Sequence, residues 1–392
     1  MSQVQGQVRV SANAAFLSLE SRLSEGKIPA LDGVRALAIS LVVLDHLHFS
    51  AIRGWGETLG RTGVTLFFVL SGFLITWLLI KEDDRTGGIS LWNFYVRRLL
   101  RIFPGFYAFW AIYVGLALLA HRHIAWGNCI AAFFYVNNYY WPLRGGGDGG
   151  MLLTWSLGVE EQFYIVWPTI FKRFRSSRES LSRGLMIVCL IVLLHRALLH
   201  YFWHVPQLYL YTAFDARMDS LAMGCLLAIS IRSRKARPVV QAVCAHWSLP
   251  AVTFALFALS MSVPYLSSNL SYWCLWGFTV ESILSATLIV QMVVLGDRFP
   301  WAWINWKGVR FIGTISYSLY LYNAMGPDMI NRSPLGHTFL RAPAGVAAAV
   351  LLASGSYYII ERPFLRLKKK YEVRSKPGVH GTQDPATEPA LV

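Results

Sequence analysis

The chain has 392 residues, of which 55% are hydrophobic and only 15% are charged. A soluble domain of this length carries about 25% charged residues, so the composition excludes a soluble globular protein. The net charge of +15 does not indicate a nucleic-acid partner, because the basic residues stand in short loops beside apolar runs, as the positive-inside rule describes. Apolar runs of about 20 residues recur along the chain, which is typical of helices that span a lipid bilayer.

The expected elements begin after a polar N-terminal segment. Residues 1–28 lack the apolar core of a cleavable signal peptide and are interpreted as a cytoplasmic segment. Residues 29–370 form the membrane domain, and the polar, proline-rich tail over 371–392 is expected to be disordered. The apolar runs predict ten transmembrane helices, near residues 34–52, 63–80, 102–120, 155–171, 184–203, 214–231, 248–263, 273–295, 309–327 and 341–360.

An eleventh apolar stretch, 128–141, is short and contains Asn137, Asn138 and Pro142. If this stretch does not cross the membrane, the strongly basic loops all fall on one side. If it crosses, the later basic loops alternate between the two sides. The positive-inside rule therefore favours an all-α fold with ten transmembrane helices and both termini in the cytoplasm.

Two connections are predicted to be more than simple turns. Residues 89–101 combine arginines with aromatic residues and predict an amphipathic helix at the cytoplasmic interface. Residues 121–154 form an outer loop that ends in the flexible run GGGDGG, which we interpret as a lid or as a gate for an acceptor.

Arg35 and His46 lie in the first predicted span, eleven positions apart. Ionisable residues inside a membrane span are costly and usually mark function. Helical geometry separates the two residues by about 16 Å, about half the hydrocarbon thickness. Arg35 can therefore stay near one interface while His46 reaches the middle of the bilayer. Histidine titrates near neutral pH, which suits a general base.

The connection before the third span groups Arg97, Arg98 and Arg101. Arg98 and Arg101 are three positions apart and share a face of a helix. Their charge is compatible with the ordinary positive-inside pattern, and equally with a guanidinium clamp for phosphate groups. In the second span, Ser71 has no strand–turn–helix elbow around it. We therefore expect it to pack, or to hydrogen-bond a polar group of a substrate, rather than to act as a nucleophile.

Further ionisable residues lie toward the outer ends of later spans. Glu160 in the fourth span is expected about 8 Å below the outer surface, where it forms a structural ion pair or meets His46, Arg217 or a substrate hydroxyl. Arg217 and Asp219 open the sixth span, where the arginine either neutralises nearby carboxylates or orients an acceptor sugar. Glu281 in the eighth span is also intramembrane.

The ninth span carries the run GTISYSLYLYN, which includes Tyr320 and Asn323. A helix with so many hydroxyl groups is not expected to face lipid on all sides, so we predict that it lines a polar cavity. The five cysteines are scattered without CxxC spacing, and we interpret them as small apolar residues rather than as metal ligands. No metal site is predicted.

These positions form a pattern in depth. The arginine group suits the phosphates of a donor that stays in the cytoplasm, while His46 is central and the acceptor residues lie toward the outside. Together the segments PALDGVRALAISLVVLDH, GVTLFFVLSGFLI, FYVRRLLRIFP, TWSLGVEEQFY, DARMDSLAMG, SYSLYLYN and ERPFL resemble the acyltransferase 3 family of membrane O-acyltransferases. The resemblance spans about residues 29–367.

The resemblance implies ten membrane spans and transfer of an acyl group, often acetyl, from acyl-CoA to a hydroxyl group. The family's Arg-x10-His pair matches Arg35 and His46, and its RxxR motif matches Arg98 and Arg101. Many members have histidine where this chain has Asn323, so a base at that position is not expected. Some members carry a fused extracytoplasmic SGNH domain. Here a second transfer step is expected either to need a separate extracytoplasmic partner or to be absent.

We therefore expect a cytoplasmic-membrane O-acyltransferase without a tightly bound cofactor. His46 would act as the base or carry the acyl group, Arg35 would bind the donor or stabilise negative charge, and Glu160 would orient His46 or the acceptor. The acceptor would be a cell-surface glycan, a lipid-linked sugar or a small metabolite such as a macrolide. A transporter of a glycan precursor, or an inactive scaffold, is the alternative.

Overall fold

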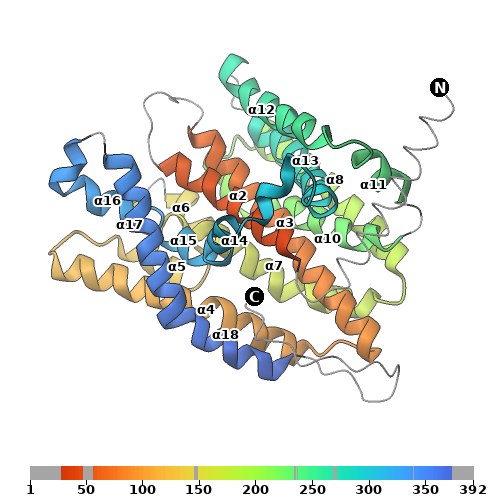
Figure 1. The fold of residues 1–392 in the computed structure, drawn as a ribbon, viewed down its shortest axis with the longest axis horizontal. Helices are drawn as coiled ribbons and strands as arrows, with labels where there is room; N and C mark the ends of the chain where they lie inside the picture. Colours follow the sequence, from red (N-terminus) through yellow and green to blue (C-terminus); the bar gives the residue numbers. More distant parts are fainter. Residues whose placement is uncertain are drawn as a thin grey trace.

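The computed structural model describes residues 28–46, 56–144, 149–233, 235, 237–267, 272–338 and 340–372. The expected N-terminal segment, nearly all of the expected tail, the end of the first predicted span and most of the GGGDGG run lie outside these residues. The described part of the chain is built of helices and contains no β-strand, which confirms the all-α class. Figure 1 shows these helices gathered around α3, which runs through the middle of the bundle.

The longer helices have the following bounds, in chain order: α2 Pro29–His46, α3 Gly56–Thr86, α4 Leu91–Leu119, α7 Thr154–Phe174, α8 Arg178–Tyr201, α10 Phe214–Ile231, α12 Leu249–Ser267, α13 Phe278–Leu295 and α17 Arg341–Ser356. Shorter helices connect them: α5 Trp126–Phe133, α6 Asn137–Arg144, α9 Gln207–Thr212, α11 Arg237–Val243, α14 Lys307–Thr314, α15 Ser316–Tyr322, α16 Met325–Asn331 and α18 Arg362–Lys368. Short π or 3₁₀ turns continue several of them: η2 Gly149–Met151, η4 Trp273–Gly277, η5 Trp301–Asn305, η6 Pro334–His337, η7 Tyr357–Glu361 and η8 Lys369–Tyr371.

Several helices are long and apolar enough to cross a membrane. Among the described residues there are five of them: Thr58–Thr86, Leu91–Leu119, Arg178–Tyr201, Leu275–Leu295 and Arg341–Tyr371. Leu249–Val263 is a shorter apolar helix. These helices make the protein a multi-pass membrane protein, as the hydropathy pattern predicts.

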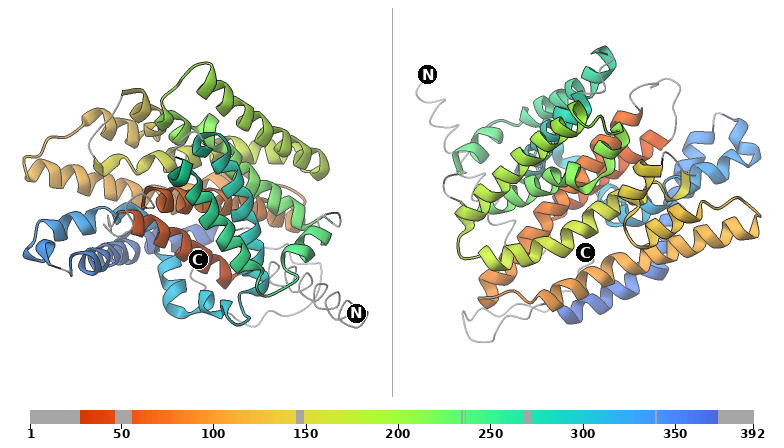
Figure 2. Two further views of the ribbon diagram at one scale, coloured as in Figure 1. Left: turned by 90° about the horizontal axis from the view of Figure 1, so that it is seen from above. Right: turned by 180° about the vertical axis from the view of Figure 1, so that it is seen from behind.

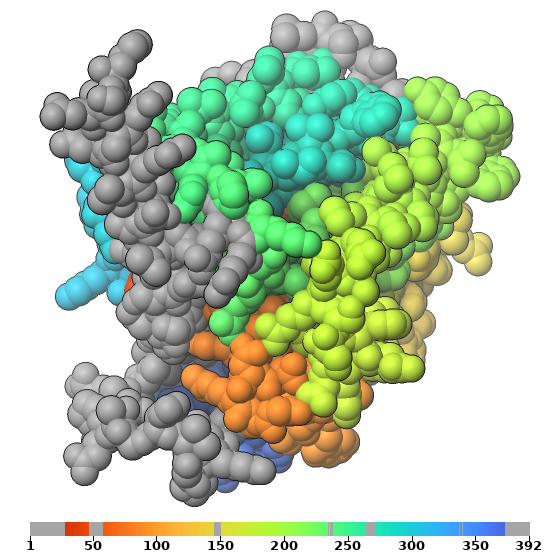
Figure 3. All heavy atoms as spheres, turned by 90° about the vertical axis from the view of Figure 1, so that its right-hand side faces the viewer, coloured from red at the N-terminus to blue at the C-terminus, as the bar shows by residue number. Residues whose placement is uncertain are grey.

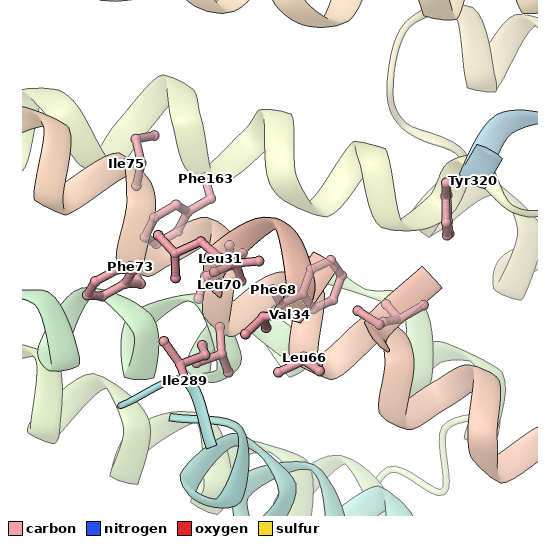
Figure 4. Close-up of a cluster of buried hydrophobic side chains, with 14 of the residues drawn as sticks. Leu31, Val34, Leu66, Phe68, Leu70, Phe73, Ile75, Phe163, Ile289 and Tyr320 are labelled. Carbon is pink, nitrogen blue, oxygen red and sulfur yellow. The ribbon is translucent and has the colours of Figure 1, made fainter. Parts of the chain in front are cut away.

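Apolar side chains from several neighbouring helices pack against α3. Figure 4 shows Leu66 and Leu70 of α3 near Leu31 and Val34 of α2, with Ile289 of α13 beside them. The backbones of α3 and α10 approach each other closely, because glycines stand where they meet. A Cβ atom added at Gly72 would overlap a backbone carbonyl oxygen of α10. Small residues at such contacts allow membrane helices to approach closely.

Ion pairs tie one end of α3 to the connection between α7 and α8. Arg178 lies 2.6 Å from Asp84, and Arg175 pairs with Asp83. Figure 3 shows the end of α3, in orange, against this yellow-green connection. The exposed face of the bundle at this end is therefore rich in charge, as expected where helices leave the lipid.

The expected interfacial helix over 89–101 is not a separate element. Ser90 caps the N-terminus of α4 by accepting a hydrogen bond from the backbone of Asn93 at 3.3 Å, and α4 then continues without interruption from Leu91 to Leu119. Pro104 lies inside this helix. A proline usually breaks a soluble helix, but membrane helices tolerate it because neighbouring groups satisfy the freed backbone.

The ninth predicted span, 309–327, is broken in the structure. It is divided among α14, α15 and α16, with interruptions at Ile315 and at 323–324. The side chain of Asn323 donates a hydrogen bond of 2.7 Å to the carbonyl of Tyr320. Such side-chain bonds compete with the helical pattern of the backbone, which accounts for the second break.

The stretch 128–141 does not form a continuous helix. It is divided between α5 and α6, and Tyr135 between them has a φ of 57°. Each helix has eight residues and rises about 12 Å, well short of the bilayer core of about 30 Å. This agrees with the prediction that the stretch does not cross the membrane.

Candidate active site

A cavity of about 120 Å³ lies where α2, α3, α4, α7 and α15 meet. Its wall brings together residues that are far apart in the sequence and that belong to different motifs. The predicted site residues that line it are Arg35, Ser71, Arg98, Arg101, Glu160 and Tyr320. Ser156, Tyr164, Ser316 and Tyr317 complete its polar lining.

The two arginines of the RxxR motif share one face of α4, as their spacing predicts, and both line the cavity. The guanidinium carbon of Arg98 lies 5.0 Å from the ring centroid of Tyr164, within the range of a cation–π interaction. Within the described ranges, no carboxylate forms an ion pair with Arg98 or Arg101. The cavity therefore has two guanidinium groups that are not paired with a carboxylate in its wall.

Arg97 lies outside this wall. It forms an ion pair of 2.7 Å with Glu82 and donates a hydrogen bond of 2.9 Å to the carbonyl of Tyr371. Glu82 also accepts a hydrogen bond from the backbone of Ser90, at 2.8 Å. Arg97 therefore connects α4 to α3 and to η8. It was expected to bind phosphates, but it does not line the cavity.

Arg35 is held by a neighbour on its own helix. Asp32, three positions earlier, accepts a hydrogen bond of 2.6 Å from its guanidinium group. The pair restricts the arginine side chain while leaving it in the cavity wall. Sequence reasoning missed Asp32, although the i, i+3 spacing in PALDGVRA was the signal that could have found it.

Hydroxyl groups form a second set of contacts around the cavity. The hydroxyls of Ser71 and Tyr164 share a hydrogen bond and lie within hydrogen-bonding reach of Glu160. Tyr320 donates to the carbonyl of Leu153 at 2.9 Å and shares a hydrogen bond of 2.5 Å with Ser156. Hydrogen bonds between hydroxyl groups therefore connect α3, α7 and α15. They also keep the carboxylate of Glu160 beside the guanidinium groups.

His46 lines a different cavity, of about 150 Å³, at the C-terminal end of α2. Asp328, Asn331 and Arg341 supply the other polar groups of its wall. His46 Nδ1 lies 2.8 Å from the carbonyl oxygen of Val42. A carbonyl oxygen can only accept, so Nδ1 carries the proton and Nε2 is the basic nitrogen of the neutral ring. Arg35 and His46 are thus held on one helix but in the walls of separate cavities.

Arg217 and Asp219 belong to a buried polar layer and line neither of these cavities. Asp219 forms an ion pair of 2.9 Å with Arg196 of α8, not with Arg217. Arg217 donates to Thr65 at 2.9 Å and stacks on the ring of Phe278, 3.7 Å from its centroid. Sequence reasoning missed Arg196, whose signal was an arginine inside the apolar run 184–203.

Asn323 is also outside the cavity wall, although Tyr320 three positions earlier lines it. Its side chain is fully buried, and its amide donates to the carbonyl of Tyr320. The residue that stands where histidine is frequent therefore shapes the break between α15 and α16.

Comparison with known proteins gives one family and several relatives. The sequence model of the acyltransferase domain family matches residues 28–358. The peptidoglycan O-acetyltransferase OatA of Listeria monocytogenes is 28% identical over 364 residues, covering 88% of this chain and 56% of that protein. The O-acetyltransferase OatA of Staphylococcus aureus is 30% identical over 326 residues, covering 79% of this chain and 52% of that protein.

A third relative, the putative peptidoglycan O-acetyltransferase YrhL of Bacillus subtilis, is 27% identical over 355 residues, covering 86% of this chain and 54% of that protein. The chain thus spans about half the length of these relatives. No solved structure matches the chain.

Proposed function

The chain belongs to the acyltransferase 3 family, and from this premise we propose that it transfers an acetyl group from acetyl-CoA to a hydroxyl group of a cell-surface glycan. The relatives are named for O-acetylation, and two of them for peptidoglycan, which favours peptidoglycan as the acceptor. The expectation of a small-metabolite acceptor is less favoured by these names.

The observation that carries the proposal is the pair of arginines in the cavity wall. Placing charged groups inside an apolar helix bundle is expensive unless a partner of opposite charge is present. Arg98 and Arg101 line the cavity, and no described carboxylate forms an ion pair with either. Guanidinium groups fit the oxygens of phosphate in a bidentate geometry. The phosphates of CoA would supply the missing negative charge.

We place the acceptor in the cavity beside His46. Arg341, Asn331 and Asp328 offer donors and acceptors together, which suits the hydroxyl groups of a sugar. Arg341 already donates to Asn331 at 2.5 Å, so the two side chains hold each other in place. The acceptor hydroxyl would approach His46 from this side.

The reaction balances with His46 as the base. Its Nε2 takes the proton of the acceptor hydroxyl, and the oxygen forms an ester bond with the acyl carbon of the thioester. The bond between that carbon and sulfur breaks, and the sulfur takes the proton from the imidazolium. For this step the pantetheine arm of CoA would extend along α2 from Arg35 toward His46, a separation of about 16 Å.

The alternative role of His46 is a transient acyl carrier, in which the imidazole attacks the thioester first. Arg35 keeps its expected role in either case, whereas Glu160 lines the cavity of the arginines and not that of His46, so it does not orient His46 directly. Arg35 binds the donor or stabilises negative charge on the thioester oxygen, and Glu160 orients groups near the arginines.

The proposal includes a topology and a location. It needs ten spans with both termini in the cytoplasm, so that the arginine cavity opens toward cytoplasmic CoA and the His46 cavity toward the outer face of the cytoplasmic membrane.

The test compares cell-wall digests from a parent strain, a deletion strain and deletion strains that produce the wild-type, His46→Ala or Arg101→Ala chain. Mass spectrometry should find the acetyl increment only with the parent and the wild-type chain, while membrane levels of both variants stay normal. A near-normal acetyl content with the His46→Ala chain would refute the assignment of His46. An unmodified cargo exported by the wild-type chain would indicate a transporter instead.

A further inference from the structure

Positive charge continues beyond the arginine cavity, onto a helix that the sequence motifs did not single out. α18 lies against α4, and both Figure 1 and the rear view in Figure 2 show the two helices side by side. Arg97 holds this contact by donating to the carbonyl of Tyr371, just past the end of α18. Lys368, the last residue of α18, is thereby placed next to the RxxR motif.

Lys368 is close to several guanidinium groups. The charges of Arg101, Arg98 and Arg97 all reach its ammonium group and repel it. Arg35 in turn feels the charges of Arg101 and Arg98. Lys368 does not line the cavity, so the positive region extends from the cavity wall to a position outside it.

The carboxylates nearby do not neutralise this region by pairing with it. Asp32 and Glu82 are engaged by Arg35 and Arg97. Glu361 accepts a hydrogen bond from Ser318, and its charge reaches Arg101. The charges of Glu160 and Glu161 reach Arg98, but among the described residues neither carboxylate forms an ion pair with an arginine of the motif. The charge of Glu372 reaches Lys368, but the structure, over the residues that it describes, has no ion pair between any carboxylate and Lys368. A group of like charges that has no ion-pair partner is stabilised when an anion binds to it directly.

We propose that Lys368 forms, with Arg98 and Arg101, a subsite for the phosphate esters of the donor, at the edge of the arginine cavity and away from the cavity of His46 that takes the acyl end. The inference rests on the proposed function, because acyl-CoA is the donor that carries such phosphates. The arginines face the cavity and hold one phosphate group in a fixed geometry. Lys368 acts as a point charge on a phosphate group further along the same molecule.

An anionic lipid headgroup has the same phosphate ester chemistry. The donor is favoured because the two arginines that cluster with Lys368 line the cavity between five helices rather than the outer face of the bundle. The experiment therefore varies the donor and the lipid separately.

The test uses the purified full chain in nanodiscs of zwitterionic lipid, with binding measured by isothermal titration calorimetry. Lys368→Gln removes the charge, and Lys368→Arg restores it. Arg366→Gln is the matched control, since Arg366 is an exposed basic residue of the same helix that points about 200° away from Lys368. The titrants are CoA, pantetheine, which has no phosphate, and inorganic pyrophosphate.

For CoA we expect Lys368→Gln to weaken binding about tenfold, equivalent to about 1.4 kcal/mol, and to reduce the dependence of binding on salt. Lys368→Arg and Arg366→Gln should bind CoA like the wild type, and pantetheine should not distinguish any variant. Equal CoA binding by Lys368→Gln and wild type, or equal losses in Lys368→Gln and Arg366→Gln, would overturn the subsite. Unchanged melting temperatures confirm that the variants are folded.

Failure of the donor assignment gives a different result. If the wild type binds no CoA, acyl-CoA is not the donor, and pyrophosphate then tests the subsite alone. Weaker pyrophosphate binding by Lys368→Gln than by Arg366→Gln supports a phosphate subsite, and equal binding overturns it. In nanodiscs that contain phosphatidylglycerol, a loss of bound anionic lipid from Lys368→Gln without a change in CoA binding assigns the residue to lipid and overturns the proposal.

Discussion

The guanidinium group of Arg98 lies over the ring of Tyr164, at 5.0 Å from its centroid. The contact joins α4 to α7 across the cavity, and the hydroxyl of the same tyrosine bonds Ser71 of α3. An aromatic ring fixes the position of a guanidinium group but does not neutralise its charge. A carboxylate would fix the position and also neutralise the charge. Arg98 therefore stays oriented and available for an anion.

This relationship predicts different results from two substitutions of Tyr164. Tyr164→Phe retains the ring and should leave the KM for acetyl-CoA within about twofold of wild type. Tyr164→Leu removes the stacking and should raise that KM about fivefold, as expected for a loss of about 1 kcal/mol. Steady-state kinetics with the acceptor held constant would measure both. If Tyr164→Phe is as defective as Tyr164→Leu, the hydroxyl and not the ring is the important group.

The cavity beside His46 gives a prediction about the acceptor. Arg341→Ala removes a donor from the cavity wall and should raise the KM for the glycan acceptor about tenfold, while the KM for acetyl-CoA stays unchanged. Lys307→Ala, on an exposed surface outside this cavity, is the control and should change neither constant. A shift of the donor KM in Arg341→Ala would contradict the separation of donor and acceptor sites.

Hydropathy predicted the all-helical class and the positions of several helices. The sixth predicted span, 214–231, coincides as a helix with α10, Phe214–Ile231, although α10 is not among the five described helices that are long and apolar enough to cross a membrane. The division of 309–327 into shorter helices was not predicted. It depends on a side-chain bond from Asn323 to the backbone, and no hydropathy average contains that information.

The site was predicted in part. The charged and hydroxylated residues of five segments meet in one cavity, as their conflict with an apolar environment suggested. Arg35 and His46 are eleven positions apart, about three full turns, so they share a face of α2. Their separation of about 16 Å along the axis was predicted, but not that it places them in the walls of two separate cavities. Their hydrogen-bond partners are on the same helix, since Asp32 accepts from Arg35 and the carbonyl of Val42 accepts from His46. The groups that complete each cavity come from other helices and could not be found from one segment.

The buried ion pair between Arg196 and Asp219 predicts a large loss of stability on single substitution. Their side chains are 0% and 2% exposed. Removing one partner leaves an uncompensated charge, so Arg196→Met and Asp219→Asn should each lower the free energy of unfolding by about 3–5 kcal/mol. The double variant Arg196→Met with Asp219→Leu should recover much of the loss. Thermal unfolding of the detergent-purified chains measures the three values, and a double variant less stable than both single variants would contradict the argument.

The contact between α3 and α10 predicts the effect of one methyl group on both stability and activity. A Cβ atom at Gly72 would overlap the carbonyl of Leu221, whereas one at Gly115 of α4 meets no atom within 4 Å. Gly72→Ala should therefore force the helices apart and cost about 1–3 kcal/mol of stability. The activity should fall as well, because the preceding residue, Ser71, lines the cavity. Gly115→Ala should be neutral or stabilise the chain by up to about 1 kcal/mol, because alanine is the better helix former. If Gly72→Ala and Gly115→Ala have the same melting temperature, α3 and α10 tolerate a wider separation. The close approach of the two helices would then not be what holds the cavity wall in place.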